Sequence, residues 1–190
     1  TSKYYNYPSS SVYSSHPEYG LLYTWSAASG RTNHTDGEVN NAGQEQYPGI
    51  CPAGWHLPSD YEWNQLEEEI AKSDAGVYST TAATTWETSY STDTGYRGAH
   101  GQKMKSTTAV TTNPAGTSNS STTNGFNALF VGRVHDGSVS SYGLIAYFWS
   151  SSSNSSSDAW FRNLRYDNTG VYRSNGYYKY NMFSVRCKKD

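Results

Sequence analysis

The clearest pattern along the chain is a helical one that begins near residue 59. Ser59 and Glu62 stand in the S-x-x-E relation of a capping box, in which each side chain accepts from the other residue's backbone N–H. Trp63, Leu66 and Ile70 then repeat at helical spacing. We therefore predict a helix over residues 59–72, with these three apolar side chains facing the core.

Four acidic side chains in the same segment raise the question of a catalytic carboxylate pair. No partner for such a pair lies nearby in the sequence, so a solvated helix face is the favoured interpretation. The residues assigned to that face are Asp60, Glu62, Glu67 and Glu68.

From residue 125 onward, short apolar-rich runs alternate with turn residues, which predicts a small antiparallel sheet. Asp136-Gly137 is a typical tight-turn dipeptide, and residues 167–170 have the composition of a four-residue turn. Together with the helix, this pattern indicates an α+β domain with one or two helices and a small twisted antiparallel sheet. The predicted strands are 126–134, 144–149, 159–166, 171–173 and 182–187.

The first part of the chain gives weaker signals. Residues 1–17 are polar without a helical period and are interpreted as an arm or a first edge strand. The apolar segment 19–28 predicts a strand that runs into a short helix, and the polar segment 107–124 is expected to be a long loop. We divide the chain into an N-terminal arm, residues 1–18, and one domain, residues 19–190.

Composition adds a functional hint. The 190 residues fit one domain, and they include 18 Tyr and 6 Trp but only 16% charged residues, against about 25% in average soluble domains. Tyr, Ser, Asn and Gly also dominate antibody paratopes, where Tyr gives rigid contact area and the small polar residues give adaptable hydrogen bonding. A binding surface and a β-rich secreted protein with polar turns both fit this composition.

Charge and hydropathy exclude two classes of partner. The formal net charge is −2, which argues against a nucleic-acid partner because such proteins carry a basic footprint. No apolar run approaches the length of about 18 residues that a membrane span needs. We therefore expect no nucleic acid and no membrane insertion of this domain.

The two cysteines, Cys51 and Cys187, are too far apart in sequence for a CxxC redox or zinc motif. An even count in a low-charge chain rich in Tyr and Ser favours one disulfide and an oxidising compartment. Two unrelated buried thiols are the alternative. A disulfide between these positions would pin the last predicted strand to the start of the helix.

The sequence offers no local catalytic or metal motif. None of the five histidines has an H-x-x-x-H or H-x-x-E-H arrangement, and nucleophile-elbow and phosphate-binding glycine motifs do not occur. His56, just before the predicted helix, is interpreted as a packed, hydrogen-bonded residue. We therefore predict a domain that is not an enzyme, with no catalytic residues, no metal site and no cofactor.

Four segments match a known family in order: residues 51–63 (CPAGWHLPSDYEW), 103–106 (KMKS), 148–151 (FWSS) and 183–187 (FSVRC). Over about residues 19–190 the chain resembles the Fibrobacter succinogenes major paralogous domain, a family with the C-type lectin fold that is related to the formylglycine-generating enzymes. The resemblance implies a C-type-lectin-like fold and an extracellular setting, on a bacterial cell surface or a phage virion. It also implies that the two cysteines form the terminal disulfide of the fold.

Two activities of related proteins are not carried over. Formylglycine-generating enzymes use a copper-binding cysteine pair, whereas Cys187 at the far end of this chain is better explained as a structural partner. Sugar-binding C-type lectins coordinate calcium through Glu-Pro-Asn or Gln-Pro-Asp, and the nearest match, Asn113-Pro114-Ala115, lacks the acidic partners. A structural calcium held by loop oxygens, for example of Asp136 or Asp167, stays open.

Tyrosines concentrate near the C-terminus. Seven of the 18 lie between Tyr142 and Tyr180, and four of the nine residues in 172–180 are Tyr, too many for a short turn region to bury. Exposed aromatic clusters mark interaction surfaces.

This region also resembles the variable proteins of diversity-generating retroelements, several of which use this fold and randomise adenine-rich codons. Residues that such randomisation can produce from Asn codons are taken as candidate ligand-binding residues, and a family that is rich in Tyr, Asn and Ser without diversification is the alternative. The candidates are Ser155, Ser157, Phe161, Asn163, Tyr166, Asp167, Asn168, Tyr172, Ser174, Asn175, Tyr177, Tyr178 and Tyr180.

We expect a receptor-binding or adhesin-type domain that buries Tyr rings against an unknown protein or glycan on a cell surface, with Ser and Asn completing hydrogen bonds at the rim. One alternative is a structural repeat domain of a bacterial surface protein, in which the tyrosines pack against sister domains. An enzyme of the formylglycine-generating type is the less favoured alternative.

Overall fold

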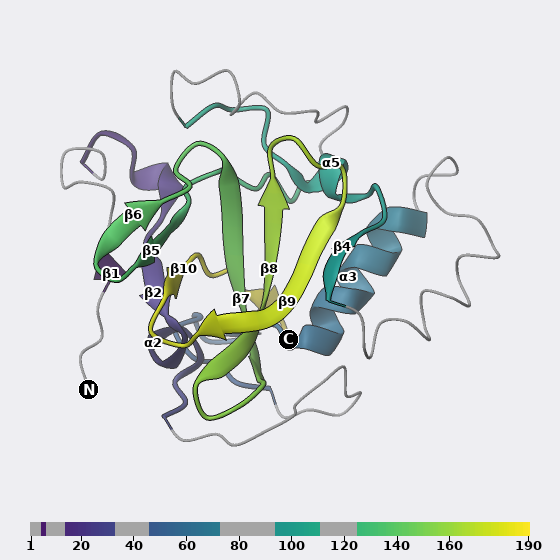
Figure 1. Ribbon diagram of the computed structural model, residues 1–190. Coiled ribbons are helices and arrows are strands. Elements are labelled where there is room, and N and C mark those ends of the chain that lie inside the picture. Colours follow the sequence, from purple (N-terminus) through teal and green to yellow (C-terminus); the bar gives the residue numbers. More distant parts are fainter. Residues whose placement is uncertain (1–4, 7–13, 33–45, 73–93, 111–124) are drawn as a thin grey trace.

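Figure 1 shows the computed structural model, which describes residues 5–6, 14–32, 46–72, 94–110 and 125–190. A four-stranded sheet lies at the centre, with helix α3 at one side and a five-stranded sheet at the other. The mainly antiparallel strands and few helices confirm the α+β class. Within the described ranges, no helix has both the length and the apolar character to span a bilayer.

The central sheet has the strand order β4-β9-β8-β7, and each neighbouring pair is antiparallel. The predicted turn at residues 167–170 joins β8 to β9, and there the Asn168 side chain accepts a hydrogen bond from the Gly170 N–H (2.9 Å). The strands are β4 Gly95–Arg97, β7 Ile145–Ser153, β8 Asp158–Arg165 and β9 Val171–Tyr178.

Two smaller sheets complete the strands. The five-stranded sheet comprises, in order, β1 Tyr5–Asn6, β2 Leu22–Thr24, β10 Met182–Phe183, β5 Arg133–His135 and β6 Ser138–Ser140. The predicted tight turn Asp136-Gly137 joins β5 to β6 with φ angles of 48° and 73°, the left-handed pair that a type I′ turn requires. The third sheet pairs β3 Trp55–His56 with β11 Lys188–Lys189.

Two predicted strands are much shorter in the structure. Of residues 126–134 only the last two belong to a strand, and of residues 182–187 only Met182 and Phe183 do. Phe126 and Phe130 are buried from irregular backbone instead. Their side chains fill space between elements without belonging to a strand. A run of apolar residues therefore predicted a longer strand than the sheet contains.

The helices are α2 Trp25–Ser29, α3 Asp60–Lys72 and α5 Gly101–Met104, beside one 3₁₀ turn, η1 Pro17–Tyr19. Helix α2 follows β2 directly, as predicted for segment 19–28. Together α2, α3 and α5 exceed the one or two helices predicted. Most of the loop predicted at 107–124 lies outside the described residues. Only its first part, 107–110, is described.

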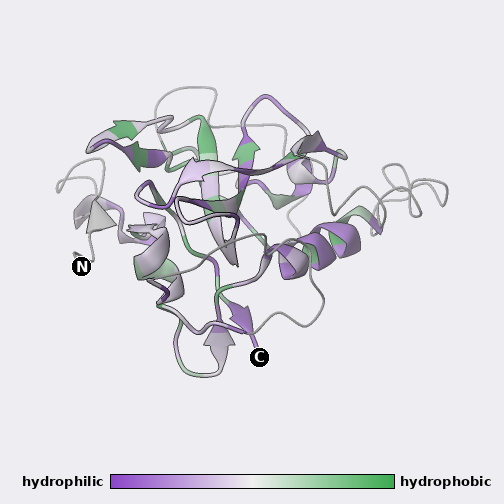
Figure 2. Cartoon of the chain, turned by 60° about the horizontal axis from the view of Figure 1, so that its bottom comes forward, coloured by the Kyte–Doolittle hydropathy of each residue, from purple (hydrophilic) through white to green (hydrophobic). Residues whose placement is uncertain are grey.

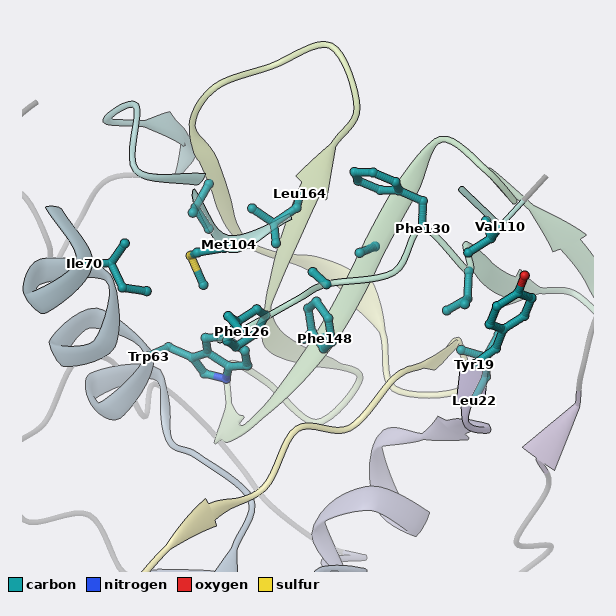
Figure 3. Packing of buried hydrophobic residues seen from close by; sticks show 14 of the residues in the cluster. Tyr19, Leu22, Trp63, Ile70, Met104, Val110, Phe126, Phe130, Phe148 and Leu164 are labelled. Carbon is teal, nitrogen blue, oxygen red and sulfur yellow. The ribbon is translucent and has the colours of Figure 1, made fainter. Parts of the chain in front are cut away.

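Two apolar clusters lie on opposite faces of the central sheet. On the α3 side, Trp63 and Ile70 point from the helix toward Met104, Phe126 and Phe148 (Figure 3). Because Tyr147 and Trp149 flank Phe148 along β7, their side chains point to the other face, where they join a second cluster.

That second cluster is mainly aromatic. The Trp149 ring stacks on Phe183 with centroids 4.0 Å apart, and Phe161 lies edge-on to Phe183 at 5.4 Å. The indole N–H groups are paired: Trp149 donates to the Tyr23 carbonyl (2.8 Å) and Trp25 donates to the Ser150 carbonyl (2.9 Å). Strand β7 is therefore buried on both faces and forms the centre of the fold.

Helix α3 confirms the prediction at its N-terminus. The Ser59 N–H donates to the Glu62 carboxylate (2.9 Å), and the Glu62 N–H donates to the Ser59 hydroxyl (3.2 Å), which is the predicted capping box. Hydrophilic and hydrophobic positions alternate along the helix (Figure 2). Leu66, however, was predicted to face the core and is 37% exposed.

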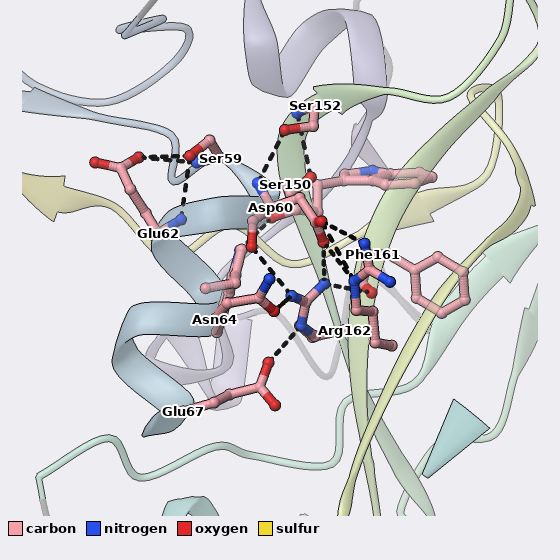
Figure 4. Close-up of polar contacts among 12 residues, drawn as sticks. Ser59, Asp60, Glu62, Asn64, Glu67, Ser150, Ser152, Phe161 and Arg162 are labelled. Carbon is pink, nitrogen blue, oxygen red and sulfur yellow. Dashed lines mark hydrogen bonds and ion pairs between the residues drawn. The ribbon is translucent and has the colours of Figure 1, made fainter. Parts of the chain in front are cut away.

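The predicted solvated face of α3 is wrong for two of its four carboxylates, because Asp60 and Glu67 are fully buried. Both point toward Arg162 of β8 (Figure 4), which reaches Asp60 with Nη1 (2.7 Å) and Glu67 with Nε (2.6 Å). Arg173 of β9 adds an ion pair to Asp60 (2.6 Å), and Arg97 of β4 adds one to Glu67. These arginines lie on strands far from the helix in sequence. The prediction considered only partners that are close in sequence, so it did not include them.

The arginines keep both carboxylates ionised. Burial by itself would raise the pKa of Asp60, but the charges of Arg162 and Arg173 outweigh that effect and lower it below its usual range. The pKa of Glu67 is lowered in the same way, since Arg97 and Arg162 outweigh the effect of burial. The helix is thus attached to the sheet by a buried charge network.

The C-terminal end of the chain is attached beside this helix. Cys51 and Cys187 form a disulfide with Cα atoms 5.8 Å apart, as predicted. Next to it, the buried His56 ring contacts Asp190 through Nδ1 (2.6 Å) and Glu62 through Nε2 (2.9 Å). This confirms the interpretation of His56 as a packed, hydrogen-bonded residue.

Candidate ligand-binding groove

The register of the central sheet decides which side chains share its outer face. Asn163 of β8 pairs with Tyr147 of β7 and with Tyr172 of β9, so these three side chains lie in one row across the sheet. In the next row, Phe161 pairs with Trp149 and Ser174. The residues between these rows, such as Arg162, point to the α3 side.

A hollow of about 400 Å³ opens over this outer face, a size within the range of ligand sites. We call it the tyrosine groove. It is lined by Tyr96, Ile145, Tyr147, Phe161, Asn163, Arg165, Tyr172, Ser174, Gly176 and Tyr177.

Aromatic rings form its floor and walls. Tyr96 and Tyr172 lie edge to face with centroids 4.9 Å apart, and Phe161 and Tyr177 are 5.0 Å apart. The Arg133 guanidinium of β5 lies 4.1 Å from the Tyr177 ring centroid, a cation–π contact that fixes this ring from outside the groove.

The polar group at the floor is the amide of Asn163. This residue is only 6% exposed, and its Oδ1 is buried without a hydrogen-bond partner among the described residues. A buried unsatisfied polar atom costs about 1–3 kcal/mol, and each such atom in a native protein calls for an explanation. Here the residue that carries the atom lines a hollow that a ligand can fill.

Two phenol groups of the groove, those of Tyr96 and Tyr147, are neutral donors and acceptors near physiological pH. Burial raises the pKa of Tyr96 and of Tyr147 above the ordinary value for tyrosine. The Arg165 guanidinium at the rim is paired with Asp167 (2.7 Å). The groove therefore combines aromatic faces with neutral hydrogen-bonding groups.

The structure brings some of the predicted site residues together and separates others. Five of them line the tyrosine groove, although Phe161, Asn163 and Ser174 are buried and form its floor rather than an exposed surface. The five are Phe161, Asn163, Tyr172, Ser174 and Tyr177.

A second subset lies around the β7–β8 hairpin and the end of β9. Ser155 and Ser157 both donate to the Asp158 carboxylate (3.0 and 2.7 Å), and Asn175 donates to Asn154 (3.0 Å). Tyr178 and Tyr180 are exposed and stack on each other with centroids 5.2 Å apart, as the local excess of tyrosine suggested. Neither ring lines the groove.

A third subset lies in the β8–β9 turn at the other end of the sheet. Strand β8 separates it from the hairpin. The buried amino group of Lys105, from the KMKS segment, donates to the backbone carbonyls of Tyr166 (3.4 Å) and Asn168 (2.5 Å), and burial lowers the pKa of Lys105 to about 8. The turn that contains Tyr166, Asp167 and Asn168 is thus held by the framework and is not part of the groove.

Comparison with protein families identifies the chain at this point. Residues 1–189 match the family model of the Fibrobacter succinogenes major domain. The chain belongs to this family. The match confirms the resemblance read from the four sequence segments, and it begins at residue 1. No curated protein and no solved structure matches the chain.

Within this member of the Fibrobacter succinogenes major domain family, sequence reasoning missed several groove residues. Ile145 and Tyr147 lie within the tyrosine-rich region 142–180 but were not among the candidate residues, and Tyr96 comes from a short strand far upstream. The strand predicted over 144–149 does not indicate which face of the sheet Tyr147 occupies. Nothing in the sequence connects Tyr96 with Tyr172, because their pairing depends on the sheet register.

The domain has a larger hollow, of about 670 Å³, between α3 and the C-terminal segment. It is lined mostly by apolar side chains such as Trp63 and Leu66. Two of its polar groups already have partners: Arg186 donates to the Phe126 carbonyl (2.7 Å), and Glu62 binds Lys188 (2.7 Å). Two others, Gln65 and Glu69, are exposed to solvent. Since its lining includes no buried polar atom that lacks a partner among the described residues, unlike Asn163, the tyrosine groove is the better candidate site.

The cysteine and metal chemistry of related proteins is not assembled here. Both cysteines are joined in the disulfide, so no free thiol pair exists. Across the described ranges, no three His, Cys, Asp or Glu side chains gather in a way that could hold a metal ion. Asp167 pairs with Arg165, and Asp136 lies 3.4 Å from His135.

Proposed function

We propose that this domain is an extracellular, non-catalytic ligand-binding module of the receptor-binding or adhesin type, with a C-type-lectin-like fold, and that the tyrosine groove is its ligand site. One observation carries the proposal. Side chains from β4, β7, β8 and β9 converge on a single hollow whose walls are aromatic and whose floor holds an amide with an oxygen that has no partner among the described residues. An apolar pocket with a few convergent polar groups is the usual form of a ligand site.

The scaffold around the groove favours binding. Its residues stand on paired strands that are fixed from behind by the buried charge network and the apolar cluster on the α3 side, and several groove rings pack into the aromatic cluster of the outer face. A rigid site loses little conformational entropy when a ligand binds, and tyrosine gives a large contact area at low entropic cost. The disulfide supports an oxidising, extracellular setting.

We expect the double substitution Tyr96→Ser and Tyr172→Ser to abolish binding. The two rings form one wall of the groove, and loss of an aromatic anchor at an interface often costs 2 kcal/mol or more, about 30-fold in affinity. Fluorescently labelled domain is incubated with a panel of fixed bacterial and animal cells, and labelling is measured by flow cytometry. The wild type should label at least one cell type, and the variant should not.

The matched control is Tyr178→Ser with Tyr180→Ser, which removes two stacked tyrosines outside the groove. This variant should label the same cells as the wild type. If the control variant loses labelling and the groove variant keeps it, the groove assignment is wrong. A wild-type domain that labels no cells but self-associates in light scattering would support the structural repeat instead.

Diversification by a retroelement is the finer part of this proposal. Exposed candidates such as Ser157 and Tyr178 can change without disturbing the core, whereas Phe161 packs against Trp149 and Phe183. Sequencing the gene across its source population should therefore show substitutions at adenine positions of exposed codons, with codon 161 kept aromatic or apolar. Even, low variation over all these codons would mean a fixed adhesin.

A further inference from the structure

The Asn163 amide indicates the kind of ligand that the tyrosine groove takes. Asn163 lines the hollow, and its buried Oδ1 has no hydrogen-bond partner in the described part of the chain. A carboxamide can donate through its nitrogen and accept through its oxygen at the same time. It therefore suits a ligand that presents a donor and an acceptor side by side.

The charge of the lining argues for a neutral ligand. Among the described residues that line the groove there is no acidic side chain, and their single cation, Arg165, is already paired with Asp167. The Tyr96 and Tyr147 phenols stay protonated because burial raises each pKa. A charged ligand would lose its hydration without meeting an opposite charge.

The backbone beneath the groove argues against an extended peptide. Strand β8 is paired on both sides, with β7 and β9, so its N–H and C=O groups are used within the sheet. Peptides that bind by adding a strand need unpaired edge groups. At the floor of the groove, only side chains are available to the ligand.

We propose that the tyrosine groove binds a neutral sugar ring, with two neighbouring hydroxyls held by the Asn163 amide and the apolar face of the ring packed on the tyrosine walls. This inference rests on the proposed function. Adjacent hydroxyls each donate and accept, which matches the carboxamide, and the C–H face of a saturated ring matches an aromatic wall. Because no carboxylate is involved, the binding does not need calcium.

The experiment is an NMR titration of ¹⁵N-labelled domain with methyl glycosides of glucose, galactose, mannose, N-acetylglucosamine and fucose, each with and without EDTA. At least one glycoside should shift the Asn163 side-chain amide signals saturably, with a Kd of about 1–10 mM, as expected for a single small ring. EDTA should leave that Kd unchanged.

Asn163→Leu separates a binding role from a structural one. Leu has a similar shape but cannot hydrogen-bond, so the variant should lose at least about tenfold in sugar affinity. Its melting temperature should stay the same or rise, because an unsatisfied buried atom is removed. The control is Asn175→Leu, which breaks the pair with Asn154 outside the groove and should bind the sugar normally.

Several results would overturn the inference. One is that no glycoside gives a saturable shift of the Asn163 signals. Another is that EDTA abolishes binding. A third is that the Asn163→Leu variant binds the sugar normally or is less stable than the wild type. Treating the cells with periodate or with protease before labelling distinguishes a wrong ligand class from a groove that binds no ligand. Labelling that survives periodate, which cleaves vicinal diols, but not protease would indicate a protein ligand and leave the groove as a binding site.

Discussion

Glu67→Gln should lower the free energy of unfolding by about 3–5 kcal/mol, the usual cost of removing one partner of a buried ion pair. Gln has nearly the shape of Glu, so packing is preserved and only the charge is lost. The Glu67 carboxylate accepts from Arg162 (2.6 Å) and Arg97 and contacts His100 (3.1 Å). With Gln in its place, Arg162 would stay fully buried with Asp60 as its remaining carboxylate partner.

The pH dependence of unfolding identifies charge as the cause. The folded-state pKa values of Asp60 and Glu67 are lowered, so their stabilising effect is complete above the ordinary carboxyl pKa of about 4 and is lost as the pH falls below it. Each such group contributes a slope of about 1.4 kcal/mol per pH unit in that range. The wild type should lose stability steeply below about pH 4. The slope for Glu67→Gln should be smaller by the contribution of one carboxyl group, about 1.4 kcal/mol per pH unit.

Glu69→Gln is the matched control, because it makes the same chemical change on the same helix. Glu69 is exposed, and its ion-pair partner among the described residues is Lys72, at 3.4 Å; exposed pairs contribute at most about 1 kcal/mol. Urea denaturation of both variants between pH 2 and pH 7 gives the comparison. Equal stability losses in the two variants, or an unchanged acid slope in Glu67→Gln, would mean that the network does not hold the helix.

These carboxylates also show why part of the fold was not predictable. The start of α3 was predicted correctly because a capping box involves residues three apart in sequence. Asp60 and Glu67 were misassigned because their partners, Arg162 and Arg173, lie about a hundred residues away. Hydrophobic periodicity treats every charged residue as solvated, so it cannot detect a charge that a distant strand neutralises.

The candidate site was predictable to a similar extent. Composition identified the tyrosine-rich region 142–180, and three of its rings, Tyr147, Tyr172 and Tyr177, line the groove. Which face each residue occupies depends on strand register, and a β-bulge between Ala159 and Phe161 shifts that register. Since side chains alternate between faces, one bulge reassigns every residue beyond it. Asn163 and Tyr178 were grouped as products of randomised Asn codons, a criterion that carries no information on register, and only Asn163 of the two lines the groove.

Reduction of the Cys51–Cys187 disulfide should lower the free energy of unfolding by up to about 5 kcal/mol. The two cysteines are 136 positions apart, and in the chain-entropy model the effect of a cross-link grows with the logarithm of the loop it closes. In the chain-entropy model, the cross-link stabilises the protein by lowering the conformational entropy of the unfolded chain. The midpoint of unfolding should therefore shift strongly although few native contacts are lost.

The native contacts near the disulfide allow a second, local readout. Strand β11 has two residues, and among the described strands it pairs with the equally short β3. Contacts beside this pairing are the hydrogen bond from the Asp190 N–H to the Gly54 carbonyl (3.1 Å), the Lys188–Glu62 ion pair and the contact of the Asp190 carboxylate with His56 Nδ1 (2.6 Å). Without the cross-link, we expect the Lys188 and Lys189 amides to exchange with solvent much faster, while amides of β8 remain protected until global unfolding.

The double variant Cys51→Ser with Cys187→Ser tests whether the bond or the added reductant is responsible. It should match the reduced wild type in urea denaturation and in hydrogen exchange, because both lack the same cross-link. A loss below about 1 kcal/mol would contradict the entropic account and would mean that the unfolded chain is already compact, or that the bond strains the native state. A large loss of stability with equally fast amide exchange in β8 and β11 would instead show that the β3–β11 pair and the central sheet unfold as one unit.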